Sequence, residues 1–447
     1  MKKIIFLVFI ILILSGCSQK QGGQLTGVEG RPEYMAVDPF GMLFIPMGNY
    51  NMGPSDQDVP WAMTTQAKSV SVQAFYMDET EITNNEYRQF VFWVKDSLAH
   101  KILGDAGMED HLIKINSVTQ EELDPPYLNW ETELDWSGEK EEVRTALDEL
   151  YLPENERFYR RKEIDTRKLK FEFYWIDYEA AAKKSGRDLD LGNGIVDHKD
   201  RSLYIKKEVI NVYPDTLAWV HDLSYSFNEP MTNMYFWHPA YDNYPVVGVN
   251  WKQARAFCIW RTQFMNSYLQ TQQDPFVQDF RLPTESEWEW ASRGGLELSP
   301  YPWGGPYIRN SNGCFLANYK PLRGNYVDDG GFHTVVVGHY NPNDFGLYDM
   351  AGNVAEWTSN AFDESAYNFS HDLNQDYTYE AKETDPPVLK RKVIRGGSWK
   401  DIGYYLQNGS KTYEYQDTAK CYIGFRCVQT FLGRDRNDGP GASNVYQ

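Results

Sequence analysis

The side chains of this chain that are best suited to redox or soft-metal chemistry are its cysteines. Apart from Cys17 they are Cys258, Cys314, Cys421 and Cys427. None belongs to a Cys-x-x-Cys pair, and the histidines contain no His-Glu-x-x-His motif. The sequence therefore gives little support to a zinc site or a dithiol redox site, although pairing of thiols is plausible in an exported chain.

The acidic stretch from Asp188 to Asp197 resembles a calcium-binding loop at first sight. An EF-hand loop needs glycine at its sixth position and a bidentate glutamate at its twelfth. Here those positions hold Asn193 and Lys199. We therefore interpret the stretch as a turn.

Three helix starts and several extended segments can be predicted from local patterns. Each helix start places a capping side chain three residues before Glu or Gln, which is the spacing of a capping box. The pairs are Thr83 with Glu86, Asn250 with Gln253, and Thr284 with Glu287, and Gly294 follows the last helix. Extended segments are expected over residues 69–76, 246–249 and 334–337.

The middle of the chain differs in composition from its flanks. Between residues 93 and 243 charged residues become denser, and helical stretches such as 138–150 alternate with tyrosine-rich segments. We predict that 93–243 is a large insertion into a domain spanning 37–432. Residues 433–447 are polar and glycine-rich and are predicted to be disordered.

The N-terminal residues have the pattern of a lipoprotein signal. Lys2 and Lys3 precede an apolar run from Ile4 to Leu14, which is too short to span a bilayer, and the run ends in Leu-Ser-Gly-Cys17. We predict a signal peptide over 1–16, lipidation of Cys17 and a tether over 17–36. The net charge of −19 argues against nucleic acid and against electrostatic docking on anionic lipid.

Segments on both sides of the predicted insertion resemble motifs of the formylglycine-generating enzyme (sulfatase-modifying factor) family, both in amino-acid sequence and in their order along the chain. They include Phe75–Asn84, Tyr244–Trp251, Arg281–Trp290, Tyr301–Gly304, Phe345–Trp357, Arg395–Trp399 and Gly424–Cys427. The resemblance implies an α+β fold with little regular secondary structure, related to C-type lectins.

The family resemblance also identifies where catalytic cysteines would stand. In catalytic members a cysteine pair follows the Arg-Gly-Gly-Ser element and performs copper-dependent oxygen chemistry, which requires thiolates. Those positions fall on Asp401 and Leu406 in this chain. The resemblance therefore implies a protein that binds no copper and is not an enzyme; a residual oxidase would need other cysteines to converge.

The same resemblance implies a disulfide and two structural calcium sites. The disulfide would join Cys258 and Cys427, with two buried free thiols as the alternative. One calcium site would use Asp349, Glu356 and the carbonyls of Gly352 and Val354, unless the two carboxylates merely bond to local backbone. The other would use Asn318, the Tyr319 carbonyl and Asp329, where the loop departs from the family pattern by one residue.

The amino-acid sequence of the insertion is similar to that of the GldK/PorK lipoproteins of the type IX secretion and gliding machinery. The similar segments are Val212–Leu217, Tyr225–Met231 and Tyr235–Tyr241. This similarity implies an outer-membrane lipoprotein on the periplasmic face, which forms a ring with copies of itself and binds a GldN/PorN-like partner. A GldJ-like gliding lipoprotein and a carbohydrate-binding lipoprotein are the alternatives.

Aromatic residues of the insertion have two interpretations. They either contact a ring partner, because interface cores favour Tyr, Trp and Phe, or pack on their own domain and cover the vacated active site. Trp219 and Trp237 are the residues chosen to test the interface interpretation.

Overall fold

The computed structural model describes residues 38–433, apart from 55–66, 117–118, 184–186, 190–195, 199–200, 227, 323, 329 and 372–374. The predicted signal peptide (1–16), Cys17, the tether (17–36) and the predicted tail beyond Gly433 lie outside the described residues. Among the described residues, no helix combines the length and apolar character needed to cross a bilayer.

The three long helices begin where the local patterns predict. They are α2 (Asn84–Asp105), α6 (Trp251–Gln272) and α7 (Glu285–Arg293). Each opens with a complete capping box, in which the cap side chain and the residue three positions later exchange hydrogen bonds with each other's backbone N–H. Helix α7 ends on Gly294 in the left-handed conformation, with φ of 60°.

The remaining helices are short. The α-helices are α3 (Glu141–Leu147), α4 (Tyr178–Ala182), α5 (Met231–Met234) and α8 (Ala366–Phe369). The 3-10 helices are η1 (Glu109–His111), η2 (Asp148–Leu150), η3 (Glu154–Glu156), η4 (Phe158–Arg160), η5 (Thr166–Lys168), η7 (Arg201–Tyr204), η8 (Thr216–Trp219), η9 (Pro239–Tyr241), η10 (Pro387–Lys390) and η11 (Gly403–Leu406).

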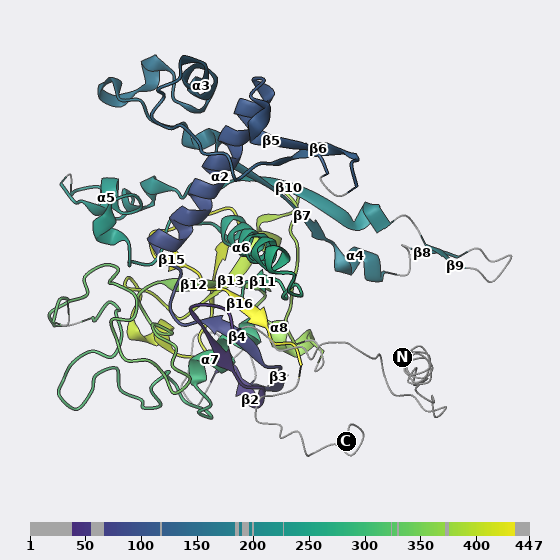
Figure 1. The fold of residues 1–447 in the computed structure, drawn as a ribbon. Helices are drawn as coiled ribbons and strands as arrows, with labels where there is room; N and C mark the ends of the chain where they lie inside the picture. Colours follow the sequence, from purple (N-terminus) through teal and green to yellow (C-terminus); the bar gives the residue numbers. More distant parts are fainter. Residues whose placement is uncertain are drawn as a thin grey trace, which may run out of the picture. The chain divides into compact units, whose positions relative to one another are not determined.

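The described strands form small sheets (Figure 1). One four-stranded antiparallel sheet has the order β1 (Met42–Ile45), β4 (Phe75–Asp78), β16 (Val428–Thr430), β11 (Phe280–Arg281). The other has the order β14 (Thr412–Tyr415), β13 (Arg391–Arg395), β12 (Ala355–Ala361), β15 (Ile423–Gly424), with β12 and β15 parallel. Two-stranded antiparallel ribbons pair β2 (Gly48–Met52) with β3 (Lys68–Val72), β5 (Leu112–Ile115) with β6 (Glu122–Leu128), β7 (Lys170–Ile176) with β10 (Ile205–Asn211), and β8 (Arg187–Leu189) with β9 (Val196–His198).

This mixture of helices, short strands and long irregular segments confirms the predicted α+β class. Of the three predicted extended segments, 69–76 overlaps β3 and β4, whereas 246–249 and 334–337 are not strands. Their backbone groups bond to scattered partners instead of one neighbouring strand: the Val246 N–H donates to the Ile82 carbonyl and the Val335 N–H to the Asn353 side chain.

The largest core cluster lies between α2 and α6, which pack against each other (Figure 1). Its aromatic rings make edge-to-face and stacked contacts, for example Tyr87 with Phe257 at 5.6 Å between ring centroids. Phe171, in the predicted insertion, packs its ring 5.3 Å from that of Phe90 on α2. Helix α2 also continues through Trp93, so the predicted insertion begins inside a helix and part of it completes the core.

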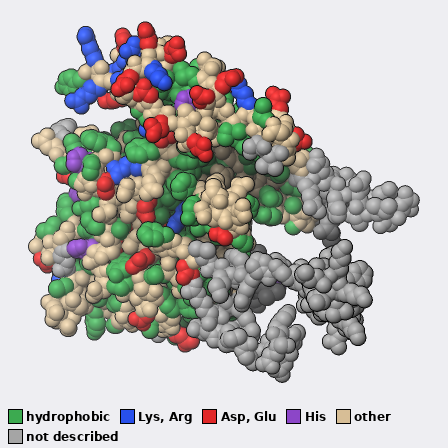
Figure 2. Space-filling view, viewed as in Figure 1, with side chains coloured by type: hydrophobic (Ala, Val, Ile, Leu, Met, Phe, Trp, Pro, Cys, Tyr) green, Lys and Arg blue, Asp and Glu red, His purple; other side chains and the backbone are tan. Residues whose placement is uncertain are grey.

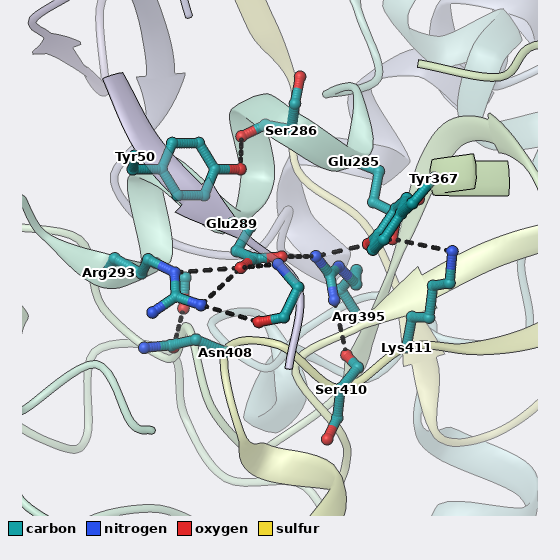
Figure 3. Close-up of polar contacts among 12 residues, drawn as sticks. Tyr50, Glu285, Ser286, Glu289, Arg293, Tyr367, Arg395, Asn408, Ser410 and Lys411 are labelled. Carbon is teal, nitrogen blue, oxygen red and sulfur yellow. Dashed lines mark hydrogen bonds and ion pairs between the residues drawn. The ribbon is translucent and has the colours of Figure 1, made fainter. Parts of the chain in front are cut away.

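A second feature of the interior is a buried network of charges between α7, β13 and the segment after η11 (Figure 3). Glu289 accepts hydrogen bonds from the Arg293 guanidinium at 2.7 and 3.0 Å with one carboxylate oxygen and pairs with Arg395 through the other. Glu285 lies 3.5 Å from Lys411. Burial alone would raise the pKa of Glu285, but Lys411 and Arg395 outweigh it and lower that pKa.

Two histidines face each other where α2 meets η1. The Nδ1 atoms of His100 and His111 are 3.0 Å apart, and both rings are buried. One ring must donate and the other accept, so the pair cannot carry a proton on both Nδ1 atoms without losing the bond. Burial is the largest effect and lowers the pKa of both imidazoles. The His100 pKa is lowered further by His111 and raised by Asp96, and the His111 pKa is raised by Asp110 and lowered by Lys140.

From the His100–His111 pair we predict that the free energy of unfolding depends on pH. Because the histidine pKa values are lower in the folded state, the unfolded chain binds more protons once the pH falls below about 6.5. We therefore expect the free energy of unfolding to decrease between pH 7.5 and 5.5, and to decrease less in His111→Gln, as measured by urea unfolding. His221→Gln, at an exposed position, is the control; if it flattens the profile equally, the pair is not the cause.

Candidate functional site

The two residues that the family resemblance places at the catalytic cysteine positions, Asp401 and Leu406, both make contacts within the fold. Leu406, at the end of η11, is 1% exposed and packs in an apolar cluster with Tyr301, Ala317 and Ala351. Asp401 accepts a hydrogen bond from the Ser398 hydroxyl at 2.6 Å. Burial raises the pKa of Asp401, against the hydrogen bonds from Ser398. Neither position presents a soft ligand to a metal.

Cys421 packs beside Trp399, which follows Ser398 in this element, and the surroundings of its thiol disfavour a thiolate. Its Sγ donates to the Asp222 carboxylate at 2.9 Å, and Asp222 also pairs with Lys400. Burial, followed by the hydrogen bond and negative charge of Asp222, raises the pKa of Cys421 well above its usual value. Because the thiolate is the metal ligand and nucleophile, Cys421 is poorly suited to either role.

Trp219, from the predicted insertion, covers this region. Its ring stacks on Trp399 with centroids 5.7 Å apart and an interplanar angle of 16°. The His333 ring contacts both tryptophans edge-on, at 5.7 and 4.9 Å. Trp219 is 2% exposed, whereas Trp237 is 52% exposed. Trp219 therefore packs on its own domain, as the alternative interpretation of these rings expects, and is not available as an interface residue. Trp237 is exposed, and its role at an interface stays a prediction.

The predicted disulfide partners lie together in the main core. The Sγ atoms of Cys258 on α6 and Cys427 are 3.4 Å apart, and both residues are buried as free thiols in this structure. Cys314 is exposed and stands apart. The two facing thiols are not beside Trp399, because Cys258 and Cys427 pack in the cluster between α2 and α6.

The loop of the first predicted calcium site contains one orphaned oxygen. Asp349 accepts from the Gly338 N–H at 2.6 Å with Oδ2, while its buried Oδ1 has no hydrogen-bond partner. Burial raises the pKa of Asp349 to about 6. Glu356 differs: its two oxygens accept hydrogen bonds from Arg426 at 2.6 and 2.8 Å, and Oε2 also accepts one from Trp288.

Glu81 belongs to the same buried group, and sequence reasoning assigned it no role. Its carboxylate accepts from the Asn353 side chain at 2.6 Å and from the Val354 N–H at 3.1 Å. Burial, then the charges of Asp349 and Glu356, raise its pKa. Its position within the Phe75–Asn84 motif was the signal that could have found it. Three carboxylates here face one guanidinium, that of Arg426.

The second predicted calcium loop packs against the first. The Asn353 N–H donates to the Asn318 carbonyl at 2.9 Å. A Cβ on Gly352 would come within 2.3 Å of that carbonyl oxygen, so the close approach requires glycine. Tyr319 follows Asn318 and is half-buried. Asp329, the remaining predicted ligand, lies outside the described residues.

These observations fit a cation only in part. Asp349 has a free buried oxygen and the group has an excess of negative charge, both of which suit Ca²⁺. Glu356, however, has both oxygens engaged by Arg426. In the part of the chain that the structure describes, no three His, Cys, Asp or Glu side chains converge as a metal site. A calcium ion would therefore depend largely on backbone carbonyls such as those of Gly352 and Val354.

Comparison with known proteins identifies the domain. Residues 31–431 match the family model described as a sulfatase-modifying factor enzyme 1-like domain. The chain belongs to this family. Residues 1–18 match the prokaryotic membrane lipoprotein lipid attachment site, in agreement with the predicted lipidation signal.

Relatives of this sulfatase-modifying factor domain include proteins named as active and as inactive enzymes. The chain is 34% identical over 196 residues to the inactive Cα-formylglycine-generating enzyme 2 of Bos taurus, covering 41% of this chain and 50% of the relative. It is 32% identical over 196 residues to the formylglycine-generating enzyme of Mus musculus, covering 42% and 45%. The chain thus spans about half the length of these relatives.

Solved structures similar to this family member include PvdO from Pseudomonas aeruginosa, with a TM-score of 0.44 and 15% identity over 87% of this chain and 94% of that one. CarF has a TM-score of 0.38 and 16% identity over 88% and 99%.

Proposed function

We propose that this lipoprotein is a non-catalytic scaffold built on a formylglycine-generating-enzyme-like domain. The observation that carries the proposal is the state of the two key positions: Leu406 is buried in apolar packing and Asp401 is bonded to Ser398. Copper-dependent oxygen chemistry needs thiolates at these positions. The names of relatives such as the inactive bovine protein support the same interpretation.

The contact between Trp219 and Trp399 supports this proposal further. An enzyme of this kind must admit a peptide substrate and oxygen to its cysteine pair. Here Trp219 of the predicted insertion stacks on Trp399. Asp222, three residues after Trp219, accepts a hydrogen bond from the Cys421 thiol. The insertion therefore uses the surroundings of the vacated site for packing.

Absence of catalysis has a direct test. The purified chain is expected to convert no Cys-x-Pro-x-Arg peptide to formylglycine and to take up no Cu(I), as measured by mass spectrometry of the peptide and by metal analysis. A formylglycine-generating enzyme with its cysteine pair is the positive control. Turnover that survives Cys421→Ser but needs copper would reveal another thiol arrangement and contradict the proposal.

We infer further that the scaffold is a ring component of the type IX secretion and gliding apparatus. The support is the similarity of residues 212–241 to GldK/PorK lipoproteins, together with the lipid attachment site. In this role the protein stands on the periplasmic face of the outer membrane, assembles with copies of itself and binds a GldN/PorN-like protein. The exposed Trp237 is the residue assigned to that contact.

The test is gentle membrane extraction followed by mass spectrometry and electron microscopy of what co-purifies. Wild-type protein is expected to bring down a periplasmic partner in ring-shaped particles, and Trp237→Ala to lose the partner while remaining folded. Tyr307→Ala removes a ring that is 76% exposed outside the insertion and serves as the matched control. Recovery of a monomer alone from wild-type membranes would contradict the ring role.

We also propose that Asp349 contributes to a structural calcium site, because its buried Oδ1 lacks a partner. Calcium added to metal-stripped protein is expected to raise the Tm by several degrees, since a ligand that binds only the folded state stabilises it. Asp349→Asn should abolish the shift, and the exposed Asp344→Asn should keep it. No shift in the wild-type protein would mean that protonation, not calcium, balances this carboxylate.

A further inference from the structure

A short loop tip concentrates positive charge and aromatic rings in a chain whose net charge is −19. Residues 157–162 read Arg-Phe-Tyr-Arg-Arg-Lys, with no acidic residue among them. They connect η3 to the segment before β7. Figure 2 shows Lys and Arg side chains interspersed with Asp and Glu on the part of the molecule that carries α3. We call residues 157–162 the basic tip.

Both aromatic rings of the basic tip face solvent. Phe158 is 70% and Tyr159 81% exposed, and their closest ring contact is with each other, edge-to-face at 4.4 Å between centroids. Isolated exposed rings are common on soluble proteins, but two adjacent rings flanked by arginines form the composition found where proteins enter a membrane interface.

The backbone of the basic tip holds the rings outward at an energetic cost. Tyr159 and Arg160 both adopt left-handed conformations, with φ of 49° and 57°, which side chains other than glycine rarely occupy. The base of the loop is fixed by the Leu152 N–H, which donates to the Glu163 carbonyl at 2.9 Å, and by Arg157, which donates to the Leu152 carbonyl at 2.7 Å. Strain of this kind concentrates at functional sites.

Two of the three positive charges at the end of the basic tip are available for a ligand. Lys162 pairs with Asp148 at 2.6 Å. Arg160 and Arg161 are exposed, and neither forms an ion pair with any side chain in the described part of the chain. Two free guanidiniums beside two exposed rings can pair with phosphate groups while the rings enter the headgroup region.

We propose that the basic tip is a second membrane contact, which docks on a surface of anionic phospholipid. The lipid attachment site brings the chain to a bilayer, and the residues between Cys17 and Asp38 can extend to about 70 Å at most, so the tip and the bilayer are confined together. Most of the negative charge of the chain does not prevent this contact, because charges more than about 8 Å away are largely screened at physiological salt. Of the carboxylates beside the tip, Asp148 pairs with Lys162 and Glu156 with Arg167, whereas Glu163 is exposed next to it. The vesicle experiment below tests this proposal against the sequence-based expectation that the net charge opposes docking on anionic lipid.

An acidic polypeptide is the competing ligand, and the geometry favours lipid. Both rings of the tip are largely solvent-exposed, so they can insert into a soft interface. A polypeptide partner would instead require a complementary surface around the tip.

The experiment uses the lipidated full-length chain in vesicles and measures chymotrypsin cleavage after Phe158 and Tyr159 by mass spectrometry. In vesicles containing phosphatidylglycerol, cleavage is expected to be at least about fivefold slower than in pure phosphatidylcholine, and 0.5 M salt should remove the protection. Cleavage after Tyr307, an exposed site elsewhere in the chain, is the internal control and should be equal in both vesicles.

Variants separate the basic tip from a general effect of charge. The double variant R160E/R161E is expected to lose the protection, whereas K101E/K382E, which makes the same charge change at two other exposed positions, should keep it. Equal cleavage rates in the two vesicles would overturn the proposal, as would equal protection at Tyr307. Protection by polyglutamate in phosphatidylcholine vesicles, without protection by phosphatidylglycerol, would assign the tip to an acidic polypeptide and also overturn it.

Discussion

Replacing Glu289 with glutamine is expected to lower the free energy of unfolding by about 3–5 kcal/mol, because it leaves two buried arginines without their shared counter-charge. Glu289 is fully buried, and its carboxylate bonds to Arg293 on one side and Arg395 on the other (Figure 3). Both guanidiniums are within 1% of complete burial, so water cannot compensate the loss. The Gly53 N–H would also lose a charged acceptor at 2.9 Å.

Urea unfolding followed by tryptophan fluorescence measures this effect. Glutamine keeps the size and one acceptor oxygen of glutamate, so the change reports the charge and not a cavity. Glu297→Gln, at an exposed position just beyond α7, is the matched control and is expected to change stability by less than about 0.5 kcal/mol. If Glu289→Gln costs no more than this control, the network does not hold α7 on β13.

The network illustrates which parts of the fold could be predicted from the sequence. Helix starts such as Thr284 with Glu287 were predictable because a capping box needs only residues three positions apart. The pairing of Glu289 with Arg395 joins residues 106 positions apart. No local pattern in the sequence specifies it, and periodicity gives no reason to bury the five charged side chains of this network together.

In the candidate site, too, features set by nearby residues could be predicted from the sequence, whereas contacts between residues far apart along the chain could not. The family resemblance alone predicted that Asp401 and Leu406 stand where catalytic members have cysteines, because both lie within a few residues of the Arg-Gly-Gly-Ser element. The sequence left open whether Trp219 packs on its own domain or contacts a partner, and it did not predict the stacking of Trp219 on Trp399, which is 180 residues away along the chain. Glu81 was missed for a similar reason: its partners Asn353 and Val354 come from a loop more than 270 residues later.

Oxidation of Cys258 and Cys427 to a disulfide is expected to stabilise the protein by about 5 kcal/mol in the chain-entropy approximation, which makes it the second large effect. The two sulfurs are already 3.4 Å apart and lie 169 positions apart in sequence, so the bond would close a long loop in the unfolded chain. An exported chain meets an oxidising compartment in which such a bond can form. Urea unfolding of protein refolded with and without a thiol–disulfide buffer measures the difference.

The order of oxidation and folding decides whether this bond can be observed. Thiol–disulfide exchange requires a thiolate, and burial raises the pKa of Cys427 far above its usual value. Folded, reduced protein should therefore resist oxidation, whereas protein folded under oxidising conditions should carry the bond and show two fewer titratable thiols. Cys258→Ala should remove this gain, and Cys314→Ser, at an exposed cysteine, should keep it. If oxidative refolding leaves Cys258, Cys314, Cys421 and Cys427 all titratable, Cys258 and Cys427 are two free cysteines that pack in the core without a bond.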